Sequence, residues 1–206
     1  TALALLGLAP LPVSGSARLS RRELVGLPDR RARRLRGRRI AMVFQEPMSA
    51  LDPLMTIGGQ LSEALARRDD SLPDKGVEEA LAEVGLPADA AGRYPFALSG
   101  GQRQRAAIAR ALAGEPDLLL ADEAVSALDL AVRGQILGLL DEAAGVRRGL
   151  VFVSHDIAAV RALCDTIAVV RGGEIVERGA TAEVCANPGS EYTRRLLAAA
   201  GPGPRR

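Results

Sequence analysis

The apolar stretch LLLAD at residues 118–122 ends in an aspartate, and a second acid, Glu123, follows it directly. Two adjacent negative charges repel each other unless a cation lies between them, so this pair favours a metal-binding or proton-accepting role. An aspartate there can hold a Mg²⁺ ion against the phosphates of a nucleotide, and the next carboxylate can face an attacking water. The alternative is that Asp122 and Glu123 only cap the next loop.

A second candidate for chemistry is the sequence Ser99-Gly100-Gly101, which precedes the helical stretch QRQRAAIARAL at residues 102–112. Backbone N–H groups at the start of a helix carry a partial positive charge and can converge on an anion. Two glycines let the backbone approach such a ligand closely. The alternative is an ordinary helix capped by Ser99.

Two further polar residues each follow a β-prone apolar run. His155, the only histidine in the chain, comes after LVFVS and before Asp156, which is expected to cap the next helix. A single histidine is more often structural than catalytic, although an imidazole at such a place can stabilise charge that develops in a transition state. Gln45 follows IAMVF, where it could equally belong to a surface loop.

The elements that must position these residues follow from the spacing of the apolar residues. PDLLLAD and GLVFVSHD are apolar runs that end in polar residues, and a helical stretch, LAVRGQILGLLDEA, lies between them. This order predicts a strand, helix and strand of a parallel sheet. Functional residues of such sheets gather at the carboxyl ends of the strands. Asp122, Glu123 and His155 are all expected at that edge.

The rest of the chain is expected to form helices and short strands around this sheet. The predicted elements are the remainder of a helix at 1–8, short strands or loop at 13–28, a buried strand at 40–45, helices between 57 and 113, a hairpin around Gly172-Gly173, and a last helix capped by Ser190.

Composition limits the class of protein. The chain has 206 residues, of which 48% are hydrophobic and 25% charged, as in an ordinary globular protein. Cys164 and Cys185 are far apart and match no metal or redox spacing, so a reducing compartment is expected. The apolar run TALALLGLAPLPV is shorter than the roughly 20 residues that span a bilayer, and it is not expected to be a membrane anchor.

An arginine-rich run, RRARRLRGRR at residues 30–39, could bind nucleic acid, because clustered arginines pair with phosphates. The alternative is a solvated face. The run contains no aromatic residue for base stacking, and acidic residues nearly balance the charge of the whole chain, whose net value is +2. We therefore expect no nucleic-acid partner.

The combination of LSGGQ, the following RQR and a strand ending in Asp-Glu resembles the ATP-binding subunits of ABC transporters. This resemblance implies an α/β, P-loop NTPase-like core at 1–56 and 114–206, with a helical subdomain at 57–113. It implies ATP and Mg²⁺ as cofactors, and a second ATPase subunit as the partner in a dimer that encloses two ATP molecules. In that dimer, the signature motif of one subunit contacts the γ-phosphate of the nucleotide held by the other.

The resemblance also implies a role for individual residues. The signature motif corresponds to Leu98, Ser99, Gly100, Gly101 and Gln102, and the Walker B strand to Leu118–Asp122. Glu123 would be the catalytic base, and His155 the residue that hydrogen-bonds the γ-phosphate. Asp122 and Gln45 would serve Mg²⁺, and Asp129 would end the D-loop Ser126–Asp129 at the dimer seam.

Three further segments are similar to those of the oligopeptide, dipeptide and nickel importer branch of this family. They are VFQEPMSALDP, RYPFALSGGQRQR and NPGSEYTRRLLAAA. This implies import of peptides or nickel, membrane-spanning permease subunits contacted through Glu46–Pro53, an extracytoplasmic solute-binding protein as an indirect partner, and a place at the cytoplasmic face of the membrane. The cysteine cluster of many such subunits is absent, so no iron–sulfur site is expected.

Two departures from the family pattern stand out. Ala124-Val125 replaces the usual Pro-Thr after the two acids, and we expect this to affect signalling across the dimer more than hydrolysis. The phosphate loop G-x-x-x-x-G-K-[ST] is missing from the 206 residues. Residues 1–8 resemble the helix that follows this loop, so Thr1 is expected to be its last residue or the next one, in a chain truncated at its start.

Without that loop, the 206 residues alone are expected neither to hold ATP tightly nor to hydrolyse it. Two alternatives to a transport ATPase remain open at this point. One is a non-catalytic interaction module that completes the site of a partner. The other is a soluble ABC ATPase that acts on DNA or ribosomes, against which the C-terminal wording and the residues around Gln45 argue.

Overall fold

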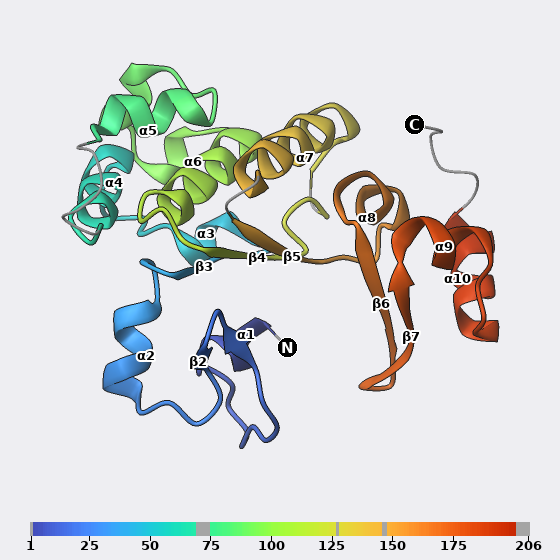
Figure 1. The fold of residues 1–206 in the computed structure, drawn as a ribbon. Helices are drawn as coiled ribbons and strands as arrows, with labels where there is room; N and C mark the ends of the chain where they lie inside the picture. Colours follow the sequence, from blue (N-terminus) through green and yellow to red (C-terminus); the bar gives the residue numbers. More distant parts are fainter. Residues whose placement is uncertain (1, 69–74, 127, 146–147, 201–206) are drawn as a thin grey trace. The chain divides into compact units, whose positions relative to one another are not determined.

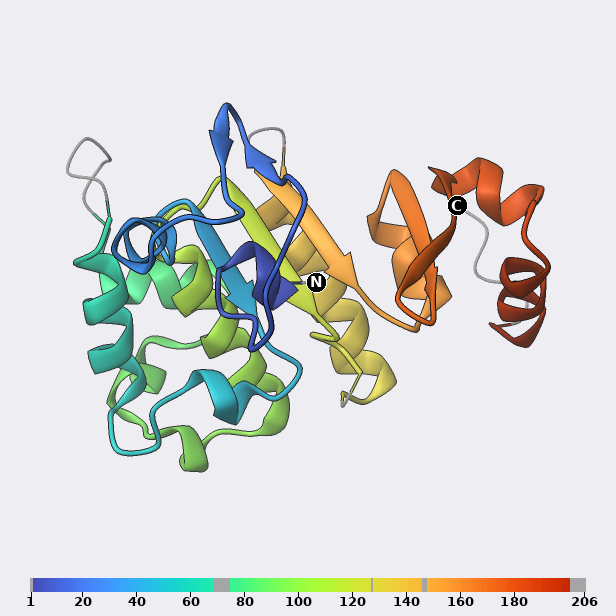
Figure 2. The same ribbon diagram turned by 90° about the horizontal axis from the view of Figure 1, so that it is seen from below.

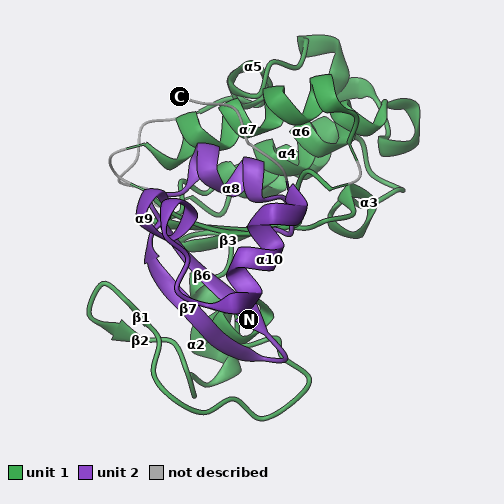
Figure 3. Ribbon diagram, turned by 90° about the vertical axis from the view of Figure 1, so that its right-hand side faces the viewer, with its two compact units in different colours: residues 1–153 green, residues 154–206 purple. Residues whose placement is uncertain are grey.

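The computed structural model describes residues 2–68, 75–126, 128–145 and 148–200. The chain forms two compact units, residues 1–153 and 154–206 (Figure 3). The predicted helical region at 57–113 lies inside the first unit. Its separation from the sheet as a subdomain of its own stays a prediction.

The first unit is built on a parallel three-stranded sheet. Its strands are β3 (Ile40–Val43), β4 (Leu118–Asp122) and β5 (Gly149–Val153), and β4 lies in the middle. Leu119 and Leu120 of β4 have no exposed surface, because both faces of the central strand are covered. The predicted buried strand at 40–45 and the predicted parallel strands within 116–122 and 149–156 are thus confirmed. The helix α7 (Leu130–Ala144) is the predicted helix between the last two.

Helices pack on one side of this sheet (Figure 1). They are α3 (Pro47–Ala50), α4 (Ile57–Leu65), α5 (Val77–Glu83), α6 (Gly100–Leu112) and α7, with 3-10 turns η1 (Ala88–Gly92) and η2 (Pro95–Ala97) between α5 and α6. The helix α6 contacts β3, α3, α4, α5 and α7, so it is the central helix of this layer. The predicted change to helical structure after residue 57 is confirmed.

The opposite side of the sheet carries the N-terminal elements, seen from below in Figure 2. These are α1 (Ala2–Leu5), the small hairpin of β1 (Arg18–Leu19) and β2 (Arg22–Glu23), and α2 (Asp29–Leu35). They share one apolar cluster with the sheet, formed by Ala2, Leu6, Leu24, Leu35, Ile40 and Leu120. The first part of the arginine-rich run therefore forms the helix α2. Ala32 and Leu35 of this helix are buried, and its arginines are exposed.

The second unit is a hairpin with three helices. Strands β6 (Thr166–Arg171) and β7 (Glu174–Ala180) are antiparallel, and both turn residues, Gly172 and Gly173, have a positive φ, of 58° and 88°. Glycine adopts this backbone without strain, which is why the predicted hairpin forms here.

The three helices of the second unit are α8 (Ile157–Leu163), α9 (Thr181–Ala186) and α10 (Glu191–Ala200). Ser190 directly precedes α10, and its carbonyl accepts a hydrogen bond from the Arg194 amide at 3.0 Å, as expected of the predicted cap. The Glu177 carboxylate of β7 accepts hydrogen bonds from the amides of Gly189 (2.7 Å) and Ser190 (3.1 Å), which ties the hairpin to the start of α10.

Candidate active site

The candidate site lies at the carboxyl edge of the parallel sheet. Asp122 is the last residue of the central strand and pairs in register with Val153 of β5, and Ala121 pairs with Val43 of β3. Gln45 comes two residues after Val43, so it leaves the sheet at the same edge as Asp122. Asp122 is half-buried and Gln45 is exposed. The structure therefore brings these two predicted Mg²⁺ ligands to the same edge.

The turn after Asp122 holds Glu123 in an unusual backbone conformation. Glu123 has a φ of 49°, in the left-handed region that residues other than glycine rarely adopt. Its amide donates to the Val153 carbonyl at 2.8 Å. Its carbonyl accepts from the Ser126 amide at 3.1 Å and from the Ser126 hydroxyl at 3.0 Å. Such strain persists only where the surroundings hold it, and it collects at functional sites.

The two residues after Glu123 are the ones that depart from the family pattern. Ala124 and Val125 are each 1% exposed. The carbonyl of Ala124 accepts a hydrogen bond at 2.8 Å from the side-chain amide of Gln104, which is itself 1% exposed. A buried valine fits this place because it leaves no hydroxyl to satisfy. Gln104 is not predicted as a site residue from the sequence. The signal that could have found it is a single amide among the apolar residues of one helix face.

Ser99 caps α6 in a reciprocal arrangement. The Ser99 hydroxyl accepts from the Gln102 amide at 3.3 Å, and the Gln102 side chain accepts from the Ser99 amide at 3.0 Å. The capped-helix alternative is thus correct as a description of Ser99. It does not use the amides of Gly100 and Gly101, for which no described residue is an acceptor. These two N–H groups are the ones that could bind an anion, whereas Leu98 is a buried core residue.

The starts of α6 and α7 lie in contact. A Cβ at Gly101 would come within 2.8 Å of Val132 Cγ1 on α7, whereas a Cβ at Gly100 would meet nothing. Asp129 caps α7 by accepting from the Val132 amide at 2.9 Å. The structure therefore brings part of the predicted signature motif next to the predicted D-loop, and it gives Gly101 and Asp129 a packing and a capping role. Their nucleotide roles stay predictions.

His155 belongs to the second unit, where its side chain is exposed. Asp156 caps α8 as predicted, because its carboxylate accepts from the amides of Ala158 (3.0 Å) and Ala159 (3.2 Å). The role of His155 at a phosphate stays a prediction. Thr1 and Ala127 lie outside the described residues.

The oxygen ligands at the edge of the sheet fit a Mg²⁺ ion that is bound together with a nucleotide. Mg²⁺ is usually held by one or two carboxylates together with substrate phosphates and water, and not by a cage of protein ligands alone. Asp122 supplies one carboxylate and Gln45 one amide oxygen. No cluster of three or more metal-ligating side chains occurs among the residues that the structure describes. In the same part of the chain, no helix is long and apolar enough to cross a membrane.

The fold and this edge define an α/β protein in which polar residues gather at the carboxyl edge of a parallel sheet. A family model described as ABC transporter matches residues 1–126, more than half of the chain, and the chain belongs to this family. Two solved structures share the fold. The ATP-binding cassette MJ0796, a dimer bound to ADP and Pi in a post-hydrolysis state, is 30% identical with a TM-score of 0.71, over 82% of this chain and 74% of that one. CbiO1 from Clostridium perfringens, part of the ABC transporter complex cbiONQ, is 25% identical with a TM-score of 0.73, over 95% and 76%.

Curated relatives of this chain are named for the transport of peptides or of peptidoglycan. The oligopeptide transport ATP-binding protein OppD of Lactococcus lactis subsp. cremoris (strain SK11) is 38% identical over 90% of this chain and 56% of its own length. The dipeptide transport ATP-binding protein DppD of Lactococcus lactis subsp. cremoris (strain MG1363) is 39% identical over 85% and 52%. The peptidoglycan transport ATP-binding protein YejF of Agrobacterium fabrum is 41% identical over 97% and 38%. The chain thus spans about half the length of the relatives it matches.

Proposed function

We propose that these residues form part of the ATP-binding subunit of an ABC importer, in which ATP hydrolysis drives the uptake of peptides. The observation that carries the proposal is the turn at the end of β4, where an acid in strained backbone follows the aspartate that ends the central strand. The names of the relatives support peptides as the solute. Nickel, the other solute that the sequence wording allows, has no support from those names.

In this proposal each residue of the site has a separate task. Glu123 accepts a proton from the attacking water, and its placement is preset by the hydrogen bonds of the turn. Asp122 and Gln45 would hold Mg²⁺, which would neutralise phosphate charge when bound with ATP. His155 donates a hydrogen bond to the γ-phosphate.

The signature motif would serve the nucleotide of a second subunit. The amides of Gly100 and Gly101 lie at the positive end of the 13-residue helix α6, and they would donate hydrogen bonds to the γ-phosphate of that nucleotide. Ser99 and Gln102 hold the first turn of the helix in shape through their reciprocal hydrogen bonds. Asp129 ends the D-loop, and its helix α7 packs against Gly101. Hydrolysis then opens the dimer and moves the permease.

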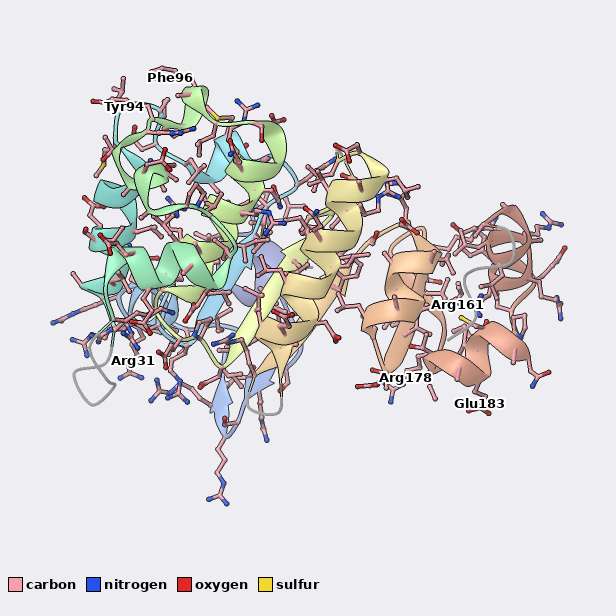
Figure 4. The ribbon with its side chains drawn as sticks, turned by 90° about the horizontal axis from the view of Figure 1, so that it is seen from above. Arg31, Tyr94, Phe96, Arg161, Arg178 and Glu183 are labelled. Carbon is pink, nitrogen blue, oxygen red and sulfur yellow. The ribbon has the colours of Figure 1, made fainter. Side chains whose placement is uncertain are left out.

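An exposed apolar surface supports a permease as the next partner. Leu54 is 85% exposed and Phe96 is 68% exposed. The rings of Tyr94 and Phe96 stack 5.5 Å apart, at the edge of the helical layer in Figure 4. A hydrogen bond of 2.9 Å from the Ile57 amide to the Arg93 carbonyl joins the segment of Leu54 to that of Tyr94. We propose that the permease docks here and on Glu46–Pro53, at the cytoplasmic face of the membrane. An extracytoplasmic binding protein supplies the solute to the permease from the opposite face.

The arginine-rich run does not favour nucleic acid as a partner. Arg33 and Arg36 pair with Asp29, and Arg36 also donates to the Leu6 carbonyl at 2.8 Å, so part of the run has a structural role. The run and the small hairpin before it contain no aromatic residue on which a base could stack.

The test uses the gene product that contains these residues, co-expressed with permease subunits. We expect ATP hydrolysis and ATP-dependent uptake of a labelled oligopeptide into vesicles. Hydrolysis without uptake of any peptide would contradict the importer assignment, and absence of hydrolysis would contradict the ATPase assignment.

A second experiment addresses the 206 residues by themselves, which contain no phosphate loop ending in lysine. We expect isothermal titration calorimetry with MgATP to show no saturable binding, because such a loop supplies several backbone donors and a lysine charge. Saturable binding would mean that the chain holds the nucleotide by another device, and the assignment of Asp122 and Gln45 would need revision.

A further inference from the structure

Gln104 is a buried amide in the middle of the site that no proposed step uses. It lies on α6, two residues after Gln102, and is 1% exposed among Ala106, Ala107 and Ile108 of the same helix. A buried amide is unfavourable unless its polar groups are hydrogen-bonded. The donor that Gln104 supplies goes to the Ala124 carbonyl, at 2.8 Å and also buried.

The carbonyl that receives this bond belongs to the residue directly after Glu123. A hydrogen bond on it fixes the peptide planes that come after Glu123, where the backbone φ is 49°. Two other residues bond to Glu123 itself: its amide donates to the Val153 carbonyl, and its carbonyl accepts from the Ser126 amide and hydroxyl. Gln104 therefore connects this strained turn to α6.

That helix is also the one that carries the signature motif. Its first turn consists of Ser99–Gln102, and Gln104 follows within the next turn, on a rigid element with an i to i−4 ladder. Arg105, the next residue, donates to the Val84 carbonyl at 2.6 Å and to the Gln135 side chain at 2.8 Å, which fixes the helix against its neighbours. A shift of the signature end of α6 would therefore displace the donor of Gln104 and with it the Ala124 carbonyl.

We propose that Gln104 is a positioning residue, which holds the Ala124 carbonyl so that the backbone of Glu123 stays in its left-handed conformation and its carboxylate stays aimed at the attacking water. Through α6, this bond makes the base of one site sensitive to what the signature motif of the same subunit contacts. The inference rests on the proposed role of Glu123 as the general base.

The chain offers a matched control in Gln60. This second buried helix amide is 4% exposed. It accepts from the Asp52 amide and donates to the carbonyls of Asp52 and Met55, none of which belongs to the turn after β4. Gln104→Met and Gln60→Met each remove a buried amide and keep a similar volume. Both variants are made in the 206-residue chain and in the gene product expressed from its native start codon.

In the 206-residue chain, amide hydrogen exchange measured by NMR reports the turn without any need for ATP. We expect Gln104→Met to speed exchange of the Glu123 and Ser126 amides by at least about 10-fold, and Gln60→Met to leave both unchanged. Unchanged exchange at Glu123 in Gln104→Met would overturn the proposal. So would equal acceleration in both variants, because it would show a general loss of stability.

In the gene product, we expect Gln104→Met to lower kcat for ATP by about 10- to 100-fold with KM changed less than about twofold, because the base is misplaced while nucleotide binding is kept. Gln60→Met should retain the parental kcat. A parental kcat in Gln104→Met would overturn the proposal. If the parental protein itself hydrolyses no ATP, the proposed function fails, and the exchange experiment still decides whether Gln104 fixes the turn.

Discussion

Two neighbouring strands, β3 and β4, end at the same edge of the sheet but lead into segments of different character. After β4, the chain enters a turn in which Ala124 and Val125 are buried and Glu123 is bonded on both its amide and its carbonyl. After β3, Gln45 is exposed, and the next element is the four-residue helix α3. The buried, hydrogen-bonded turn is thus the one that holds Glu123, where proton transfer is proposed. The segment proposed to contact a permease begins next to an exposed residue, Gln45.

This difference has a physical basis. A general base must keep its distance and angle to the water during the reaction, so backbone strain and buried hydrogen bonds are useful at Glu123. Gln45 is exposed, so neither buried packing nor a strained turn fixes its side chain in the same way. Predictions about stability can therefore separate the two strand ends.

The largest effect on stability is expected at Gly101, in the first turn of α6. Gly101→Ala places a Cβ 2.8 Å from Val132 Cγ1, and overpacking of this kind costs about 1–3 kcal/mol. Gly100→Ala is the matched control, because its Cβ meets nothing and alanine favours the helix. Urea unfolding of the 206-residue chain measures both. Equal stability of the two variants would show that α6 and α7 do not approach as closely as the structure has them.

A smaller effect is expected when the turn loses one of its hydrogen bonds. Ser126→Ala removes the 3.0 Å bond from the Ser126 hydroxyl to the Glu123 carbonyl, which should lower the free energy of unfolding by about 0.5–1.5 kcal/mol. Gln45→Ala, at the other strand end, should change it by less than about 0.5 kcal/mol. If Gln45→Ala proves the more damaging of the two, the contrast between the strand ends is wrong.

The strain at Glu123 predicts a gain in stability at the expense of function. Glu123→Gly removes the Cβ that disfavours a φ of 49°, and we expect the unfolding free energy to rise by about 0.5–1 kcal/mol. Gln45→Gly should give no such gain. Thermal unfolding followed by circular dichroism compares the two, and a loss of stability in Glu123→Gly would argue that its side chain stabilises the fold.

The smallest effect concerns a third strand end, at the surface. Glu23 ends β2 and accepts from the Ser16 hydroxyl at 2.5 Å and the Ala17 amide at 2.8 Å, which lower its pKa from 4.5 to about 2. A lowered pKa in the folded state stabilises the fold above pH 4.5, and this contribution is lost as the pH falls from 4.5 towards 2. NMR titration should give a Glu23 pKa near 2, and Glu23→Gln should remove this part of the acid sensitivity. A pKa of 4.5 would show that the turn is not formed in solution.

Much of the fold is predictable from the sequence, because its signals are local. Leu118–Ala121 reads as one apolar run since the strand is covered on both faces, and Gly172-Gly173 marks a turn that needs positive φ at both residues. Ser99 and Asp156 are recognisable as caps because each precedes a helical stretch. The positions of the candidate residues at the carboxyl edge follow from the strand order in the same way.

Other features are not predictable because they depend on tertiary contacts. The left-handed backbone of Glu123 depends on its hydrogen bonds to Val153 and Ser126, which a sequence does not show. A glutamate in a sequence does not by itself predict a positive φ. The role of Gln104 depends on its hydrogen bond to the Ala124 carbonyl, 20 positions away, and the sequence does not show this bond. The helix α2 forms within an arginine-rich run because Ala32 and Leu35 pack into the core, although the run has the composition of a solvated face.

The central claim is that Glu123, held by the turn after β4, activates water for ATP hydrolysis. The most direct measurement is the steady-state rate of phosphate release from ATP by the gene product and by its Glu123→Gln variant, with ATP-bound dimers followed by size-exclusion chromatography. We predict a loss of about 10²- to 10⁴-fold in the rate, with ATP-bound dimers accumulating. Turnover at the parental rate by the Glu123→Gln variant would contradict the account.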